Sequence, residues 1–249
     1  MGDHAPHGSE GDDLTSAAGG PQRPADASPP EKSSAEEHEQ AIERGRWLFA
    51  QECRFVAGAA EIEQIPGGSL PEVAFAGRSN VGKSSLVNAL TGRRTLAKVS
   101  NTPGRTRQLN FFTLGDRLML ADLPGYGYAQ ASKEQVANWT RLVESYLLGR
   151  SPLRRVLLLI DARHGLKEVD RQVMAKLDRS AVSYQAVLTK ADQLKPAELE
   201  ARLAEVAAEL GRHPAAHPQV MATSASKSDG IPALRAALAG LIDWREQPR

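Results

Sequence analysis

The sequence predicts an α/β domain with a six-stranded, mostly parallel sheet and helices on both faces. Two observations support this fold class. From residue 73 to residue 244, short apolar runs alternate with segments of helical periodicity, which is the pattern of a doubly wound sheet. The first of these runs leads into GRSNVGKS at residues 77–84, which matches a phosphate-binding loop between a strand and a helix. The chain is therefore expected to contain a P-loop domain.

The segment before this domain has a different composition. Residues 1–44 are rich in Gly, Pro, Ser, Asp and Glu, and they carry ten acidic and three basic side chains, a net charge of −7. Such a segment buries too little apolar surface to offset its ordering entropy. We therefore expect a disordered acidic tail at residues 1–44 and the folded domain at residues 45–249. The tail is interpreted as a solvating extension, and a functional tail is the alternative.

The elements of the domain follow in chain order. Strands are expected at residues 73–77, 108–114, 117–122, 155–161, 183–189 and 219–222. Gly115 and Asp116 join the second and third strands as a hairpin, the one antiparallel pair in the predicted sheet. The run at 155–161 is almost continuously apolar, as in a central strand that is covered on both faces. Helices are expected at residues 83–90, 132–148, 166–178, 196–210 and 231–244.

The residue types of the phosphate-binding loop suit its expected chemistry. Gly77 and Gly82 let the backbone approach phosphate oxygens, and the loop amides form an anion site at a helix N-terminus. Lys83 is expected to reach the β and γ phosphates, and the Ser84 hydroxyl is expected to ligate Mg²⁺. The other residues of the loop that are expected to contact the nucleotide are Arg78, Ser79, Asn80 and Val81.

A second motif, DLPG, closes the strand at 117–122. The Asp122 carboxylate is expected to hold the Mg²⁺ shell through a water molecule. Gly125 is expected to offer its backbone N–H to the γ-phosphate, and Leu123 and Pro124 complete this part of the nucleotide site.

Two further motifs concern the base. Asp192 ends TKAD, and its carboxylate is expected to accept hydrogen bonds from the ring N–H and the exocyclic amine of guanine. Adenine has no donor at that ring nitrogen, so such a site selects guanine. The Lys190 stem is expected to cover the base face. The remaining expected base contacts are Thr189 and Ala191 of this motif and Thr223 of the TSAS segment. The other residues of that segment, Ser224, Ala225 and Ser226, are expected to supply backbone contacts to the guanine oxygen.

The polar segment 93–107 is expected to be a switch that γ-phosphate contacts order and hydrolysis releases. Thr106 is its candidate for a second Mg²⁺ ligand, so the expected catalytic groups are Lys83, Thr106 and Gly125. Arg105 and Arg107 have three candidate roles, which are to stabilise transition-state charge, to contact RNA phosphate or to remain solvated. Partner contact is favoured over an internal arginine finger. The expected nucleotide contacts of this segment are Gly104, Arg105, Thr106, Arg107 and Gln108.

Two positions differ from the pattern of Ras-like GTPases. Tyr126 follows Gly125, where Ras-like proteins have the glutamine that orients the attacking water, so intrinsic hydrolysis is expected to be slow. Asn80 lies inside the phosphate loop, where its amide oxygen is placed to coordinate a monovalent cation beside the phosphates. An asparagine that only stabilises the loop is the alternative.

Composition narrows the cellular context and the class of partner. Cys53 is the only cysteine, no run approaches 18 apolar residues, and the N-terminus lacks the apolar core of a signal peptide. We therefore expect a cytoplasmic protein without membrane insertion. Residues 45–249 carry 28 basic and 20 acidic side chains, a net charge of +8. This charge suits a polyanionic partner, and a solvated charged surface is the alternative.

The chain resembles the EngB (YihA or YsxC) family of ribosome-biogenesis GTPases, within the TrmE–Era–EngA-type group. The likeness runs from about residue 55 to residue 244 and rests on VAFAGRSNVGKSSLVNAL, TPGRTRQLNFF, DLPGYGYA, DARHGLKEVD and LTKADQL. It implies Mg²⁺-dependent GTP binding and hydrolysis to GDP, with Mg²⁺ ligated by Ser84 and Thr106. It also implies a role in late assembly of the large ribosomal subunit and a link to cell division and septation. Related GTPases with this loop type use K⁺, which favours the cation interpretation of Asn80.

The leading functional hypothesis is therefore a monomeric GTPase that docks on the large ribosomal subunit or its precursor, through rRNA and ribosomal proteins. One alternative is a GTP-dependent binding module at the division site with negligible turnover. The other is a GTPase of tRNA modification, although that type normally carries an extra domain for which this chain has no room.

Overall fold

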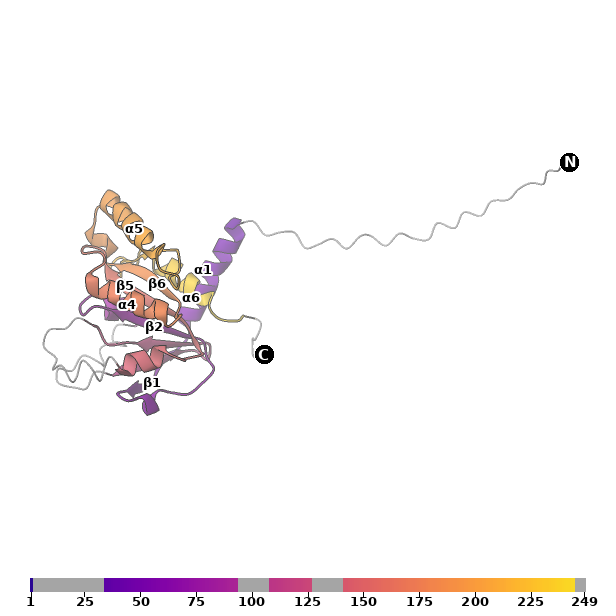
Figure 1. The fold of residues 1–249 in the computed structure, drawn as a ribbon, viewed down its shortest axis with the longest axis vertical. Helices are drawn as coiled ribbons and strands as arrows, with labels where there is room; N and C mark the ends of the chain where they lie inside the picture. Colours follow the sequence, from indigo (N-terminus) through magenta and orange to yellow (C-terminus); the bar gives the residue numbers. More distant parts are fainter. Residues whose placement is uncertain (2–33, 94–107, 127–140, 245–249) are drawn as a thin grey trace. The chain divides into compact units, whose positions relative to one another are not determined.

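The computed structural model describes Met1 and residues 34–93, 108–126 and 141–244. The described residues from 34 onward form a seven-stranded sheet with helices on both faces (Figure 1). The strand order is β1-β3-β4-β2-β5-β6-β7. β3 pairs antiparallel with both β1 and β4, and the other neighbours are parallel. The predicted fold class and hairpin are confirmed, and the predicted count of six strands is wrong by one.

The bounds of the elements agree closely with the predicted ranges. The strands are β1 (Cys53–Ala59), β2 (Glu72–Gly77), β3 (Leu109–Leu114), β4 (Leu118–Asp122), β5 (Leu153–Asp161), β6 (Tyr184–Thr189) and β7 (Met221–Ala222). The helices are α1 (Ser34–Ala50), α2 (Lys83–Thr91), α4 (Glu168–Arg179), α5 (Pro196–Leu210) and α6 (Ile231–Ala239), with 3-10 turns η1 (Ile62–Gln64) and η3 (Ala191–Gln193). Residues 141–147 are also helical, and residues 132–140 of the helix predicted at 132–148 lie outside the described residues.

The C-terminal helix is shorter than predicted. α6 ends at Ala239 rather than at Trp244, with Gly240 as its C-cap residue. The Trp244 indole Nε1 donates a hydrogen bond to the Ala239 carbonyl at 2.8 Å, and its ring packs edge-on against Trp47 of α1.

The additional strand, β1, lies at the edge of the sheet. Its successive residues Arg54, Phe55 and Val56 are all exposed, so it lacks the alternation of buried and exposed positions that reveals most strands. A register shift between Phe55 and Ala57 interrupts its pairing with β3. The sequence pattern therefore does not reveal this strand, because only one of its edges is paired and a bulge breaks its period.

Helix α1 corrects the predicted boundary of the acidic tail. The compact unit begins at Ser34 rather than at residue 45, and α1 packs against α6. Residues 34–44 contain neither Gly nor Pro, and Glu36 and Glu37 in the first turn favour the helix through its dipole. A composition averaged over residues 1–44 hides this change. Residues 2–33 lie outside the described residues, so disorder there remains a prediction.

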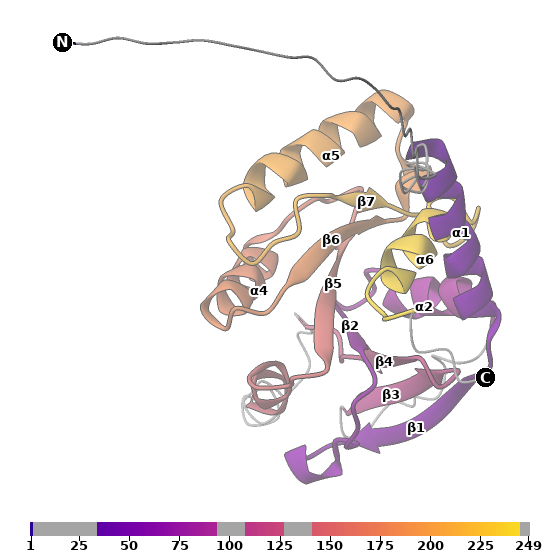
Figure 2. The same cartoon turned by 90° about the vertical axis from the view of Figure 1, so that its right-hand side faces the viewer.

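Each face of the sheet has its own apolar core (Figure 2). Val156, Leu158 and Ile160 of β5 face a core shared with α4, α5 and residues 141–147. Leu157 and Leu159 of the same strand face a second core shared with α1, α2 and α6. A strand that is buried on both faces is continuously apolar, which explains the run predicted at 155–161.

At Gly45, α1 lies directly against the backbone of α6. A Cβ atom added to it would lie 2.6 Å from the Ala236 backbone nitrogen and 2.7 Å from the Arg235 carbonyl carbon. Gly45→Ala is therefore expected to lower the free energy of unfolding by about 1–3 kcal/mol through overpacking, although alanine favours a helix by about 1 kcal/mol. Urea denaturation measures this change. Glu39→Ala, at an exposed position of α1, is the control and should stay within about 0.5 kcal/mol of wild type. A Gly45→Ala protein as stable as wild type would contradict the tight contact.

Candidate nucleotide-binding site

The candidate site lies at the carboxyl edge of the parallel strands, where ligands bind in doubly wound sheets. β2 ends at Gly77, β4 at Asp122, β5 at Asp161 and β6 at Thr189. These ends are aligned, because Phe75 is in register with Asp122 and Asp161 is in register with Thr189. Three of the predicted motifs therefore begin or end at one edge of the sheet.

The phosphate-binding loop connects β2 to α2. Asn80 and Gly82 have φ values of +63° and +102°, which allow the tight turn into the helix. A Cβ atom at Gly77 would lie 2.9 Å from the Val81 Cγ1 atom, so the loop packs closely on the end of β2. The N-terminus of α2 has no side-chain cap, which leaves its first amides available as donors to an anion.

Lys83, which is expected to bind phosphate, lies beside Ser84 and Asp122, which are expected to hold the metal ion. The Lys83 ammonium donates a hydrogen bond to the Asp122 carboxylate, and both side chains are largely buried. Ser84 is the second residue of α2 and directly follows Lys83. Gly104, Arg105, Thr106 and Arg107 lie outside the described residues, so the second metal ligand remains a prediction.

The segment that follows β4 is bonded to the phosphate-binding loop. Leu123 donates its backbone N–H to the Phe75 carbonyl at 3.1 Å, and Ser79 donates its own to the Tyr126 carbonyl at 3.0 Å. A Cβ atom at Gly125 would lie 3.0 Å from the Cα atom of Ser79. Gly125 therefore sits directly against the loop, with Pro124 between it and the buried Leu123.

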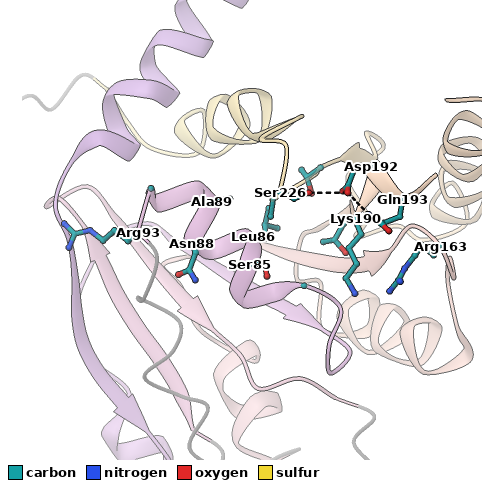
Figure 3. A pocket seen from close by; sticks show the side chains of 15 residues that line it. Ser85, Leu86, Asn88, Ala89, Arg93, Arg163, Lys190, Asp192, Gln193 and Ser226 are labelled. Atoms are coloured by element: carbon teal, nitrogen blue, oxygen red, sulfur yellow. Dashed lines mark hydrogen bonds between the residues drawn. The ribbon is translucent and has the colours of Figure 1, made fainter. Parts of the chain in front are cut away.

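The opposite end of the site contains the residues predicted for the base. Figure 3 shows the side chains around a cavity of about 590 Å³, with Asp192, Ser226 and Lys190 grouped at one end and Arg93 at the far end of α2. The Asp192 Oδ2 atom accepts hydrogen bonds from Gln193 at 2.7 Å and from Ser226 at 3.2 Å. Hydrogen bonds from Gln193 and from Ser224 are the main causes that lower the Asp192 pKa, so this carboxylate is ionised at neutral pH.

The TSAS segment lies beside Asp192, as predicted. Thr223 accepts the backbone N–H of Ala191 at 3.0 Å, and Thr223 and Ala225 line the cavity. The buried Ser224 hydroxyl lies 3.0 Å from the Ser226 hydroxyl, which in turn contacts Asp192. Ser226, which the sequence predicted to contact the base through its backbone, thus also reaches Asp192 with its side chain.

The base segment is hydrogen-bonded directly to the phosphate-binding loop. The Thr189 hydroxyl donates to the Val81 carbonyl at 2.6 Å, and the Lys190 ammonium donates to the Asn80 carbonyl at 2.8 Å. Lys190 therefore extends from one motif to the other along the wall of the cavity (Figure 3). These bonds set the separation between the phosphate end and the base end of the site.

Asp161 supports this arrangement and was not predicted as a site residue. Its buried carboxylate accepts a hydrogen bond from Lys190 at 2.8 Å and two from the Arg163 guanidinium at 2.7 and 2.9 Å. Burial alone would raise the Asp161 pKa, but the hydrogen bonds from Arg163 and Lys190 outweigh it and lower that pKa well below its usual range. The signal was present in the sequence, because Asp161 ends a buried parallel strand just as Asp122 does.

The side chain of Gln108, a predicted nucleotide contact, is bonded within the β1–β3 edge of the sheet. Its Nε2 atom donates to the Asn110 side chain at 3.1 Å, and its side chain lies against Gly58 of β1. Gln108 does not line the cavity beside Asp192.

The described ranges 34–93, 108–126 and 141–244 contain neither a membrane-spanning helix nor a metal-binding cluster of acidic, His or Cys side chains. No helix there is long and apolar enough to cross a membrane. No cluster there of three or more His, Cys, Asp or Glu side chains could hold a metal ion.

Comparisons with known proteins agree with this geometry. A family model described as "50S ribosome-binding GTPase" matches residues 72–190. The chain is 60% identical over 214 residues to a probable GTP-binding protein EngB of Rhodospirillum rubrum, covering 84% of this chain and 93% of the relative. It is 57% identical over 206 residues to a protein of the same name from Bradyrhizobium diazoefficiens, covering 82% and 95%. A crystal structure of a probable GTP-binding protein engB has a TM-score of 0.55 at 21% identity, covering 68% of this chain and 97% of that chain, which supports the fold.

The Asp161 carboxylate gives a test of how the two ends of the site are held together. Asp161→Asn is expected to lower the free energy of unfolding by about 1 kcal/mol at neutral pH, because a neutral amide binds Arg163 and Lys190 less strongly and both cations are partly exposed.

The pH dependence has a defined sign. Because folding lowers the Asp161 pKa, its contribution is complete above the usual value of 3.8 and is lost as the pH falls below it. The difference between wild type and Asp161→Asn, measured by chemical denaturation at several pH values, should be constant near neutrality and shrink in acid. Glu43→Gln, which removes an exposed ion pair with Arg46, is the control and should change stability little. A difference that grows as the pH falls would contradict the assignment.

Proposed function

The chain belongs to the EngB family of GTP-binding proteins, and from this premise we propose that it hydrolyses GTP with Mg²⁺ during assembly of the large ribosomal subunit. The observation that supports this proposal best is the pairing of a phosphate-binding loop with a guanine-type carboxylate at one sheet edge. We also propose that the protein is cytoplasmic and that its activity is linked to normal cell division and septation.

The proposed chemistry assigns a separate task to each group around the loop. The loop amides and Lys83 bind the phosphate oxygens, and Gly125 donates its N–H to the γ-phosphate. The Ser84 hydroxyl would ligate Mg²⁺, and Asp122 would hold the ion through a water molecule. When bound, Mg²⁺ neutralises charge on the phosphate oxygens. Two oxygen donors fit this ion, because Mg²⁺ commonly takes only one or two protein ligands beside substrate phosphates. Thr106 is the proposed additional ligand.

K⁺ is the proposed second cation. Asn80 is exposed at the tip of the loop, and its backbone carbonyl already accepts the Lys190 ammonium. Its side-chain oxygen is the group that would ligate K⁺ beside the phosphates. Such a cation supplies positive charge where an arginine finger acts in other GTPases.

Docking on the ribosome is supported by charge and by the family. The net charge of +8 on residues 45–249 suits rRNA phosphates, whose neutralisation releases counterions. The matching family model is described as ribosome-binding. We propose that a monomer docks on the large subunit or its precursor and that docking accelerates otherwise slow hydrolysis.

A second candidate function is a GTP-dependent binding module at the division site, in which nucleotide state rather than turnover carries the signal. The observation that favours it is the placement of Tyr126, whose hydroxyl is bonded to Asp170 at 2.8 Å. The residue at the Ras glutamine position is therefore not free to orient water.

Nucleotide choice tests the base site. Asp192→Asn is expected to weaken GTP binding about tenfold or more, because a hydrogen-bonding charge is lost. The variant should gain affinity for xanthosine nucleotides, whose ring carbonyl can accept from the new amide. Titration with GTP, XTP and ATP measures both effects. Asp229→Asn, which changes an exposed aspartate beside the TSAS segment, is the control and should bind GTP like wild type. Equal affinity of wild type for ATP and GTP would contradict the assignment of Asp192.

Turnover tests the cation and the ribosomal partner together. The GTPase rate of the protein is expected to be low in Na⁺, several-fold higher in K⁺, and higher again with purified large subunits at low salt. Asn80→Gly should lose the response to K⁺ while keeping the loop conformation, because glycine adopts the Asn80 φ of +63° without strain. Stimulation by subunits should decline steeply as salt rises. If large subunits neither bind the protein nor stimulate its GTPase activity at low salt, the hypothesis of a binding module at the division site is favoured.

A further inference from the structure

Asp170 is a fully buried carboxylate in the first turn of α4, and three parts of the chain meet on it. Its Oδ1 atom accepts the Tyr126 hydroxyl at 2.8 Å, and its Oδ2 atom accepts the Lys167 backbone N–H at 2.9 Å. The Arg78 guanidinium lies 3.2 Å from Oδ2 as an ion pair. A buried charge needs partners of this kind, so Asp170 holds all three in place.

Two of these partners belong to the candidate site. Arg78 is the second residue of the phosphate-binding loop, and Tyr126 directly follows Gly125. Tyr126 is also fixed by its backbone, because its N–H donates to the Gly77 carbonyl at 3.1 Å and its carbonyl accepts from Ser79 at 3.0 Å. The Tyr126 ring lies in the core beside α4, and burial followed by the nearby Asp170 raises its pKa well above the usual range. Its hydroxyl is therefore a fixed neutral donor.

Gly125 is thus held from both sides. Three residues before it in the sequence, Asp122 is paired with Lys83. Directly after it, Tyr126 is anchored to Asp170. Gly125 itself has no room to move toward the loop, because a Cβ atom on it would already lie 3.0 Å from Ser79. The direction of the Gly125 N–H therefore depends on where Tyr126 is anchored.

We propose that Tyr126, through its bond to Asp170, is a positioning residue that sets the Gly125 N–H for the γ-phosphate and so determines the preference for GTP over GDP. This inference rests on the proposed function, because it assumes that Gly125 contacts the γ-phosphate. In this role Tyr126 does not replace the water-orienting glutamine of Ras-like proteins. It fixes the backbone beside it.

Tyr126→Phe tests the proposal, because it removes the hydroxyl and keeps the ring. Affinity for a non-hydrolysable GTP analogue is expected to fall about tenfold, while affinity for GDP changes less than about twofold. Calorimetric titration of both nucleotides into the full chain gives the ratio of the two affinities. A residue that only stabilises the fold would lower the melting temperature and leave this ratio unchanged.

Tyr146→Phe is the matched control. The Tyr146 hydroxyl donates to the buried Glu72 carboxylate at 3.2 Å, and Arg150 Nε donates to the same carboxylate at 2.9 Å. Both tyrosines lie in the same core, but Tyr146 is bonded at the opposite end of β2 from the loop. Its variant should lose stability and keep the wild-type ratio of GTP-analogue to GDP affinity.

Asp170→Asn provides a second variant if Tyr126→Phe does not fold. Asparagine has one acceptor oxygen where Asp170 has two. When that oxygen accepts the Lys167 N–H, the amide nitrogen faces the Tyr126 hydroxyl, which loses its acceptor, so the same fall in the affinity ratio is expected. An unchanged ratio in whichever of these variants folds would overturn the proposal. Wild-type protein that binds guanine nucleotides without preferring the GTP analogue would overturn it as well. Wild-type protein that binds no guanine nucleotide would instead overturn the proposed function, and this inference with it.

Discussion

The site depends on hydrogen bonds between the base segment and the phosphate-binding loop. Thr189 and Lys190 reach the Val81 and Asn80 carbonyls, so two motifs that are more than a hundred residues apart in sequence form one rigid wall. The base and the phosphates of a nucleotide are joined through one ribose, which limits the distance between them. A site whose two ends are already fixed at that separation loses less conformational freedom on binding. The parallel sheet makes this possible, because it brings the ends of β2 and β6 to the same edge.

Buried carboxylates fix the parts of the site to one another. Asp122 pairs with Lys83, Asp161 with Arg163 and Lys190, and Asp170 with Arg78 and Tyr126. Breaking a buried pair leaves an uncompensated charge, so such pairs specify geometry more reliably than they add stability. Each of the three links a strand end or a helix start to a loop. The loops of the site are therefore held by charge, while the sheet beneath them is held by apolar packing.

Most of the fold could be predicted from the sequence because its central elements are buried on both faces. The run of β5 and the motifs at the ends of β2, β4 and β6 follow directly from residue types. β1 could not be predicted, because an edge strand with a bulge and the exposed Phe55 and Val56 has no periodic pattern. The start of α1 was hidden because the apolar residues that bury it begin near Gly45, while its first turns are polar and exposed. In the site, residue types identified Lys83 and Asp192. The position of Asp161 at the end of a buried strand was a sequence signal that was not used, whereas Asp170 acts through contacts that only the folded chain creates.

Two sets of tyrosine, carboxylate and arginine lie at opposite ends of one core, and their comparison separates stability from function. Tyr146, Glu72 and Arg150 connect the start of β2 to the segment before β5, where no predicted motif lies. Tyr126, Asp170 and Arg78 have the same chemistry, but they connect the loop after β4 to the phosphate-binding loop and α4. Both carboxylates are buried, and any buried charge needs hydrogen-bonding or oppositely charged partners. The presence of such partners therefore does not indicate function. What distinguishes the second set is that two of its members are covalent neighbours of residues expected to contact phosphate. Position along the chain, rather than the interaction itself, therefore gives Tyr126 its proposed role.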